Sequence, residues 1–128
     1  MKKHYLDIDG KWAFIFAYDI GWKDIKEVCD WLEALGADEE DIYRSQVALS
    51  KLNTGLTYSN SSLRMSVMCI GNATDKSQWW DTVVHEIYHL QNTISHYYDV
   101  DRDSEDPAYL QGYILRLIIK AIRHDGFK

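Results

Sequence analysis

His85 and His89 lie four residues apart with Glu86 between them, in a stretch that is predicted to be helical. Residues four apart lie on the same face of an α-helix, one turn from each other. Two imidazoles in this arrangement can bind one metal ion, typically zinc, with the intervening glutamate beside them as a general base. The simpler interpretation is two histidines and a glutamate on an ordinary helix. We take the metal site as the leading hypothesis, with Zn²⁺ as the ion.

A catalytic zinc ion normally has three protein ligands and one open position. His96 shares the helix face of His85 and His89, but in an unbroken helix it lies about 10 Å beyond His89 along the axis. An arrangement with a turn-forming glycine and a third histidine ten residues after the first would need Gly at Asn92 and His at Ser95. We therefore place His96 at the surface or beside the pocket, without a role as ligand.

Glu105 is the stronger candidate for the third ligand. It begins the next predicted helix, after a loop that is long enough for the chain to reverse direction. Its helix face also carries the small residues Ala108 and Gly112, which would allow a close approach to the first helix. Carboxylates are common at helix N-termini for purely structural reasons. The neighbouring aspartates remain alternative ligands: Asp101, Asp103 and Asp106.

The segment from Thr82 to His89, followed by Glu105-Asp106-Pro107-Ala108, resembles the gluzincin pattern, in which HExxH on one helix is completed by a glutamate on the next. It is most similar to the short ImmA/IrrE-type metallopeptidase domains of bacteria and mobile elements, because Thr82 and Ala108 match residues common there. Residues 78–115 also resemble small phage or prophage proteins. The resemblance implies a small zincin-like domain in which His85, His89 and Glu105 bind zinc.

The same resemblance implies the role of the other groups. Glu86 would accept a proton from water and pass it to the leaving amine. A tyrosine or histidine would stabilise the oxyanion. The candidates for that role are His96, Tyr97, Tyr98, Tyr109 and Tyr113.

Three functional hypotheses follow. The first is a zinc-dependent hydrolase, most simply a metallopeptidase, whose peptide or protein substrate adds to an edge strand. Residues 63–70 are our prediction for that strand, and their alternating pattern equally fits an interior strand. The second is a non-enzymatic binding or accessory protein, encoded by a phage or mobile element, on the same scaffold. The third is an interaction module without a metal.

The elements that must position these residues are predicted from hydrophobic periodicity and turn residues. Strands are expected at residues 11–18, 56–59 and 63–70. Helices are expected at residues 22–35, from 38 to a stop at 53–55, from 77 to about 98, and from 105 or 107 to about 124. With about three strands and four helices, the chain is predicted to be one α+β domain over residues 1–128, its sheet packed against the HExxH helix.

Composition restricts the number of domains, the class of partner and the cellular location that we expect. The chain has 128 residues, of which 46% are hydrophobic, and this is sufficient for one core. A net charge of −6 opposes binding to nucleic acid. No apolar run is long enough for a membrane span, and no hydrophobic signal region follows Lys2-Lys3. Cys29 and Cys69 are isolated thiols, so we predict a reducing cytoplasmic location. The oligomeric state is not defined by these features.

Overall fold

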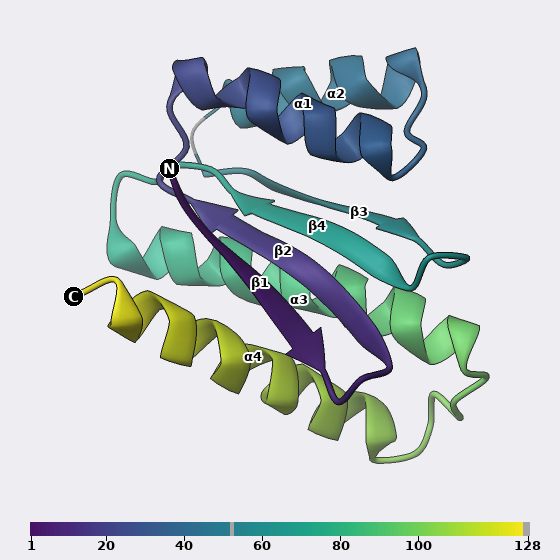
Figure 1. Ribbon diagram of the computed structural model, residues 1–128. Helices are drawn as coiled ribbons and strands as arrows, with labels where there is room; N and C mark the ends of the chain where they lie inside the picture. Colours follow the sequence, from purple (N-terminus) through teal and green to yellow (C-terminus); the bar gives the residue numbers. More distant parts are fainter. Residues whose placement is uncertain (52, 127–128) are drawn as a thin grey trace.

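The computed structural model describes residues 1–51 and 53–126, and within them four α-helices surround a four-stranded sheet (Figure 1). The α+β class is therefore confirmed. The strands are β1 (Lys2–Ile8), β2 (Trp12–Tyr18), β3 (Gly55–Asn60) and β4 (Met65–Ile70). The helices are α1 (Ile25–Ala34), which follows the short 3₁₀ helix η1 (Trp22–Asp24), α2 (Glu39–Leu49), α3 (Lys76–Tyr97) and α4 (Asp106–His124).

The sheet is mixed, in the order β1-β2-β4-β3. β1 and β2 are antiparallel, β2 and β4 are parallel, and β3 and β4 are antiparallel. A parallel pair requires a long crossover connection, and here α1, α2 and β3 lie between the two strands in sequence. The two central strands are covered on both faces, which explains their nearly continuous apolar sequences.

Two apolar clusters occupy the two faces of the sheet. On one face, Val67 and Cys69 pack with Val28 and Leu32 of α1. On the other face, Phe14, Phe16, Met68 and Ile70 pack against α3 and α4 through Val83, Leu90, Ile114 and Ile118. Successive side chains of a strand point to opposite faces, so one strand contributes to both clusters. Figure 1 shows the resulting layers, with α1 and α2 above the sheet and α3 and α4 below it.

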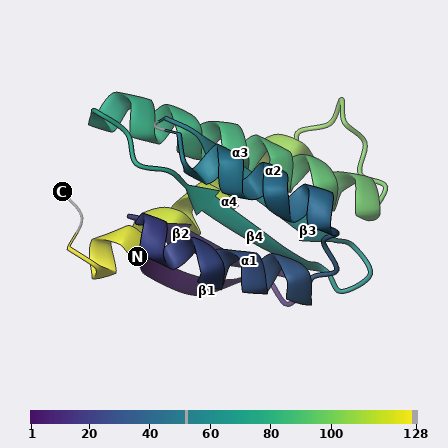
Figure 2. The same cartoon turned by 90° about the horizontal axis from the view of Figure 1, so that it is seen from above.

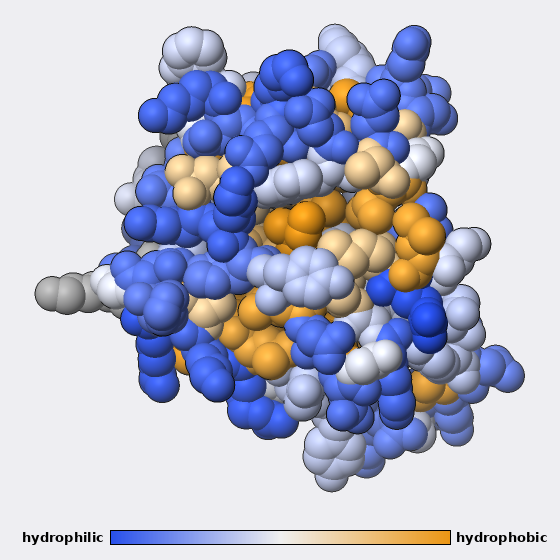
Figure 3. All heavy atoms as spheres, viewed as in Figure 1, coloured by the Kyte–Doolittle hydropathy of each residue, from blue (hydrophilic) through white to orange (hydrophobic). Residues whose placement is uncertain are grey.

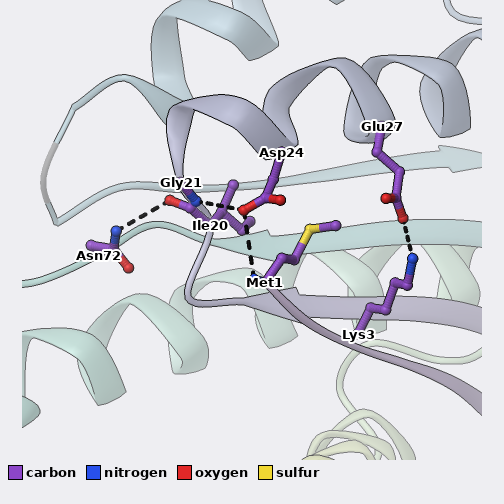
Figure 4. Close-up of polar contacts among 7 residues, drawn as sticks. All are labelled: Met1, Lys3, Ile20, Gly21, Asp24, Glu27 and Asn72. Atoms are coloured by element: carbon purple, nitrogen blue, oxygen red, sulfur yellow. Dashed lines mark hydrogen bonds and ion pairs between the residues drawn. The ribbon is translucent and has the colours of Figure 1, made fainter.

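Polar contacts fix α1 and its preceding turn to the start of β1 (Figure 4). The Met1 backbone nitrogen lies 3.5 Å from an Asp24 carboxylate oxygen that also accepts a hydrogen bond from the Gly21 amide at 2.9 Å. Lys3 forms an ion pair with Glu27 on the first turn of α1. These contacts connect the upper helical layer to the edge of the sheet.

The edge strand β1 is partly open on the side shown in Figure 3, where apolar side chains gather over β1 and β2 between α1 and α4. Tyr5 on this strand is 69% exposed. The charged side chains of Lys2 and Lys3 are exposed on the same strand, and charges of this kind discourage pairing with another sheet.

Three sequence predictions about elements need correction. The sheet has a fourth strand, β1, because the alternation around Leu6 and Ile8 forms a hairpin with β2. The strand predicted at 63–70 as the substrate-binding edge is β4, which is an interior strand; the edge strand beside α3 is β3. The helix predicted from residue 77 begins at Lys76, because Asp75 caps α3 by accepting a hydrogen bond from the Gln78 amide at 2.9 Å.

Candidate functional site

The two histidines form a pair on one side of α3. Nε2 of His85 and Nε2 of His89 are 3.1 Å apart, and their ring centroids are separated by 4.7 Å. The opposite side of α3 contributes Val83, Ile87 and Leu90 to the core, so the pair lies outside the core, where solvent reaches it. The His85 side chain is 67% exposed.

The two nitrogens lie at hydrogen-bonding distance from each other, and the same distance fits a shared metal ion. If each nitrogen lies about 2.05 Å from one ion, a separation of 3.1 Å gives an angle of about 98° at the ion, against about 109° in an ideal tetrahedron. The helical spacing alone therefore brings two imidazole nitrogens to a separation that one ion can bridge, without a change in the backbone.

Glu86 lies between α3 and the edge strand β3, and only 4% of the residue is exposed. Its Oε1 accepts a hydrogen bond of 2.8 Å from the Thr57 hydroxyl of β3, and its Oε2 lies 4.0 Å from Nε2 of His85. One carboxylate oxygen is thus held by the sheet, while the other lies 4.0 Å from the imidazole of His85. Burial raises the pKa of the nearby Cys69 thiol on β4, and the negative charge of Glu86 raises it further.

Gly55 allows β3 to lie close to α3 at this point. A Cβ at this position would lie 2.9 Å from the Cys69 carbonyl oxygen, 2.9 Å from Cγ2 of Thr82 and 3.0 Å from Cγ of Glu86. Real Cβ atoms essentially never come this close to other atoms. The absence of a side chain therefore brings the edge strand into contact with the glutamate.

A groove between β3 and α3, which are in contact, contains the site. Figure 2 shows α3 on the side of the molecule away from β1, and β3 is the sheet edge opposite β1. It consists of two adjoining cavities that share Gly55, His85 and Glu86. The larger, of about 540 Å³, is also lined by Leu56, Thr57, Ser59, His89, Asn92 and Thr93. The smaller, of about 270 Å³, is also lined by Asn53, Thr54, Asp81 and Thr82.

The structure does not bring Glu105 to the histidine pair. Glu105 is the exposed N-cap residue of α4. Gln91 of α3 donates a hydrogen bond to Gln111 of the antiparallel α4 at 3.2 Å, so Glu105 lies beside the C-terminal end of α3 near Tyr97. That end is roughly 12 Å from His89 along the helix axis. Within residues 1–51 and 53–126, no three His, Cys, Asp or Glu side chains form a metal-binding group, and this applies equally to Asp101, Asp103 and Asp106.

Gly112 was predicted to let α4 lie close to α3, and this prediction is wrong. A Cβ added at Gly112 would have no atom within 4 Å, so this glycine does not face α3 closely. The two helices pack through the apolar cluster described above, and a polar contact adjoins it near Gly112. Ser95 donates to Oε1 of Gln91 at 2.7 Å, and the Gln91 amide nitrogen donates to Gln111.

The residues predicted to stabilise an oxyanion lie elsewhere. His96 is exposed in the last turn of α3, and Tyr109 is 70% exposed on α4. The Tyr97 ring packs edge-on against Trp12 at 5.5 Å. None of the three lines the two cavities of the groove.

Other polar groups take their place at the groove. Asn92 and Thr93 follow His89 by three and four residues, so helical spacing alone predicts that they lie on the same side of α3 as the histidines. Thr57 and Gly55 had no local signal, because their role depends on the packing of β3 against a distant helix.

Comparisons with protein families give no support for the resemblance to gluzincins. No family model matches the chain, and no curated protein or solved structure matches it either. Together with the missing third ligand among the described residues, this contradicts the assignment to the ImmA/IrrE-type and related phage metallopeptidase domains. The fold is established as α+β with a mixed sheet, and the zincin-like assignment has no structural neighbour to confirm it.

No helix within the described residues has the length and apolar character needed to cross a lipid bilayer.

Proposed function

We propose that this protein is a zinc-dependent hydrolase that acts on peptide bonds in the groove between β3 and α3. The observation that carries the proposal is the placement of three groups: two imidazole nitrogens 3.1 Å apart and a buried carboxylate with one oxygen facing them. In this proposal Nε2 of His85 and Nε2 of His89 hold the ion. Bound zinc supplies Lewis-acid chemistry, which polarises a carbonyl and favours deprotonation of water at neutral pH.

Glu86 is the general base of this proposal. Its Oε2 is directed to the groove and accepts a proton from a water molecule there, while Thr57 holds Oε1 and fixes the orientation of the carboxylate. The same carboxyl group then donates the proton to the leaving amine. Thr57 is a positioning residue in this proposal, because its hydroxyl acts through the carboxylate of Glu86.

The edge position of β3 supports a peptide as substrate. β3 pairs with β4 on one side only, so backbone groups on its other side are available to an extended peptide that adds to the sheet. Such a peptide would run beside α3 and pass the histidine pair.

The number of protein ligands available to zinc supports a second function, that of a non-enzymatic binding protein. Catalytic zinc normally has three protein ligands, whereas the described residues supply two. A non-enzymatic binding protein, in which the groove holds a peptide without turnover, agrees with this smaller donor set. The two functions differ in whether hydrolysis depends on Glu86.

The test combines metal binding with turnover. We expect zinc titration of metal-stripped protein to show one site that His89→Ala abolishes. His96→Ala, which removes another exposed histidine of the same helix, should leave zinc affinity unchanged. Equal zinc affinity in parent and His89→Ala would overturn the metal site.

The second part uses a mixed peptide library followed by mass spectrometry. We expect Glu86→Gln to retain zinc and to lower the rate of cleavage by about 10²-fold or more. Cleavage at the parental rate would remove Glu86 from the mechanism. Zinc binding with no cleavage by the parent would favour the binding protein.

A further inference from the structure

The groove extends past His85 to the smaller cavity, and one end of that cavity is acidic. Asp81 precedes His85 by one turn of α3, which places it about 6 Å from the imidazole along the helix axis. The described residues that line this cavity include two carboxylates, Asp81 and Glu86, and no lysine or arginine.

The polar groups of this cavity differ in whether they are already engaged. Glu86 accepts the hydrogen bond from Thr57. The Thr54 hydroxyl donates to the carbonyl oxygens of Ala48 and Lys51, at 2.5 and 2.9 Å. Asp81 is exposed, and no hydrogen bond or ion pair joins its carboxylate to another residue in the described part of the chain. Asp81 is therefore the charged group that remains to meet a ligand.

We propose that Asp81 makes this end of the groove selective for a positively charged group on the substrate, an inference that rests on the proposed function. The chemistry is that of an ammonium or guanidinium group, from a Lys or Arg side chain or from the free amino terminus of a peptide. An extended peptide advances about 3.3 Å per residue, so a distance of about 6 Å corresponds to two residues. The cationic group belongs within two residues of the bond at the histidine pair.

In this proposal the residue that selects the substrate, Asp81, is distinct from the residues that act on the bond, His85, Glu86 and His89. Asp81 and His85 lie on the same side of one rigid helix, so the distance between the cation and the reacting bond is set by the helix itself. Replacement of Asp81 changes which peptides bind and leaves the positions of the imidazoles and Glu86 intact.

The experiment measures peptide binding without turnover, in zinc-loaded Glu86→Gln protein. The probes are fluorescent peptide libraries with an acetylated amino terminus that contain lysine or glutamine at each position, and an unacetylated library without lysine or arginine. We expect about fivefold tighter binding of the lysine library or of the free-amine library than of the acetylated glutamine library, as for an exposed ion pair near its upper limit. The two favoured libraries distinguish the side chain from the amino terminus as the source of the cation.

Asp81→Asn in the same background should reduce that preference to less than twofold. Asp103→Asn, which removes an equal charge from an exposed loop outside the groove, is the matched control and should preserve it. A preference that is absent, or that survives Asp81→Asn, would overturn the inference. A cation preference that depends on Asp81, found together with no hydrolysis by the parent, would support the inference and refute the hydrolase.

Discussion

Substitution of Gly55 by alanine tests how the edge strand is held against the site. The backbone of Gly55 is not in the left-handed region, so alanine can adopt its conformation and the effect comes from space alone. The added methyl group would meet the Cys69 carbonyl oxygen, Thr82 and Glu86 at 2.9 to 3.0 Å. One of these is a backbone atom of the neighbouring strand, which cannot move without a shift of the sheet.

The magnitude follows from two opposing terms. Overpacking in a well-packed region typically costs about 1–3 kcal/mol, and contact on three sides favours the upper part of that range. Replacement of glycine restricts the unfolded chain and returns about 0.4–1 kcal/mol. We therefore expect Gly55→Ala to lower the free energy of unfolding by about 2 kcal/mol, and to move β3 away from Glu86.

Gly112→Ala is the matched control, because its Cβ would have no atom within 4 Å and its position is in the middle of α4. Alanine is favoured over glycine within a helix by about 1 kcal/mol, so this variant should be more stable than the parent. Urea unfolding followed by circular dichroism would measure both changes. A Gly55→Ala protein as stable as Gly112→Ala would show that β3 does not lie against α3 as described.

Two further substitutions test polar contacts. Thr57→Val removes the hydroxyl that donates to the buried Glu86 carboxylate. We expect the free energy of unfolding to fall by about 1–3 kcal/mol, measured by urea unfolding, and peptide cleavage to slow at least tenfold. Thr57→Ser should restore both. Asp125 accepts hydrogen bonds of 2.6 Å from Tyr18 and His4; burial alone would raise its pKa, but these bonds hold it below the ordinary value of 3.8. Its contribution to stability is present above that value and is lost as the pH falls through the lowered pKa. Asp125→Asn should therefore cost about 1 kcal/mol at pH 7, discounted for solvent screening, and less at pH 2. An equal cost at both pH values would contradict the assignment.

The helices and most strands were predictable because their signals are local. The long amphipathic pattern of α3 and the apolar run of β2 each lie within one segment, and Gly36, with a φ of 90°, follows the end of α1 directly. β1 was missed because its alternation carries charged and aromatic residues on the open face, and only pairing with β2 gives it a partner. The order of the strands depends on pairing between distant segments, so the sequence did not distinguish an edge position from an interior position for β4.

In the candidate site, too, features set by local spacing were predictable and features set by tertiary packing were not. The histidine pair follows from helical spacing, so it was found correctly as a close pair. Glu105 was assigned by sequence distance and the length of a loop, but the unbroken length of α3 carries the chain past His89 before it turns. Thr57 and Gly55 meet Glu86 only through tertiary packing, and no spacing in the sequence indicates that contact.

The parallel pairing of β2 and β4 has a consequence for the order of folding. Residues 19–64 separate the two strands, so their alignment closes a long loop, whereas the β1–β2 hairpin and α3 need only local contacts. The imidazole pair can thus form in a nascent helix before the sheet is complete. The groove beside it forms only after β4 has joined β2 and brought β3 to the edge. A folding intermediate with α3 formed would present the imidazole pair to solvent before the groove beside it exists.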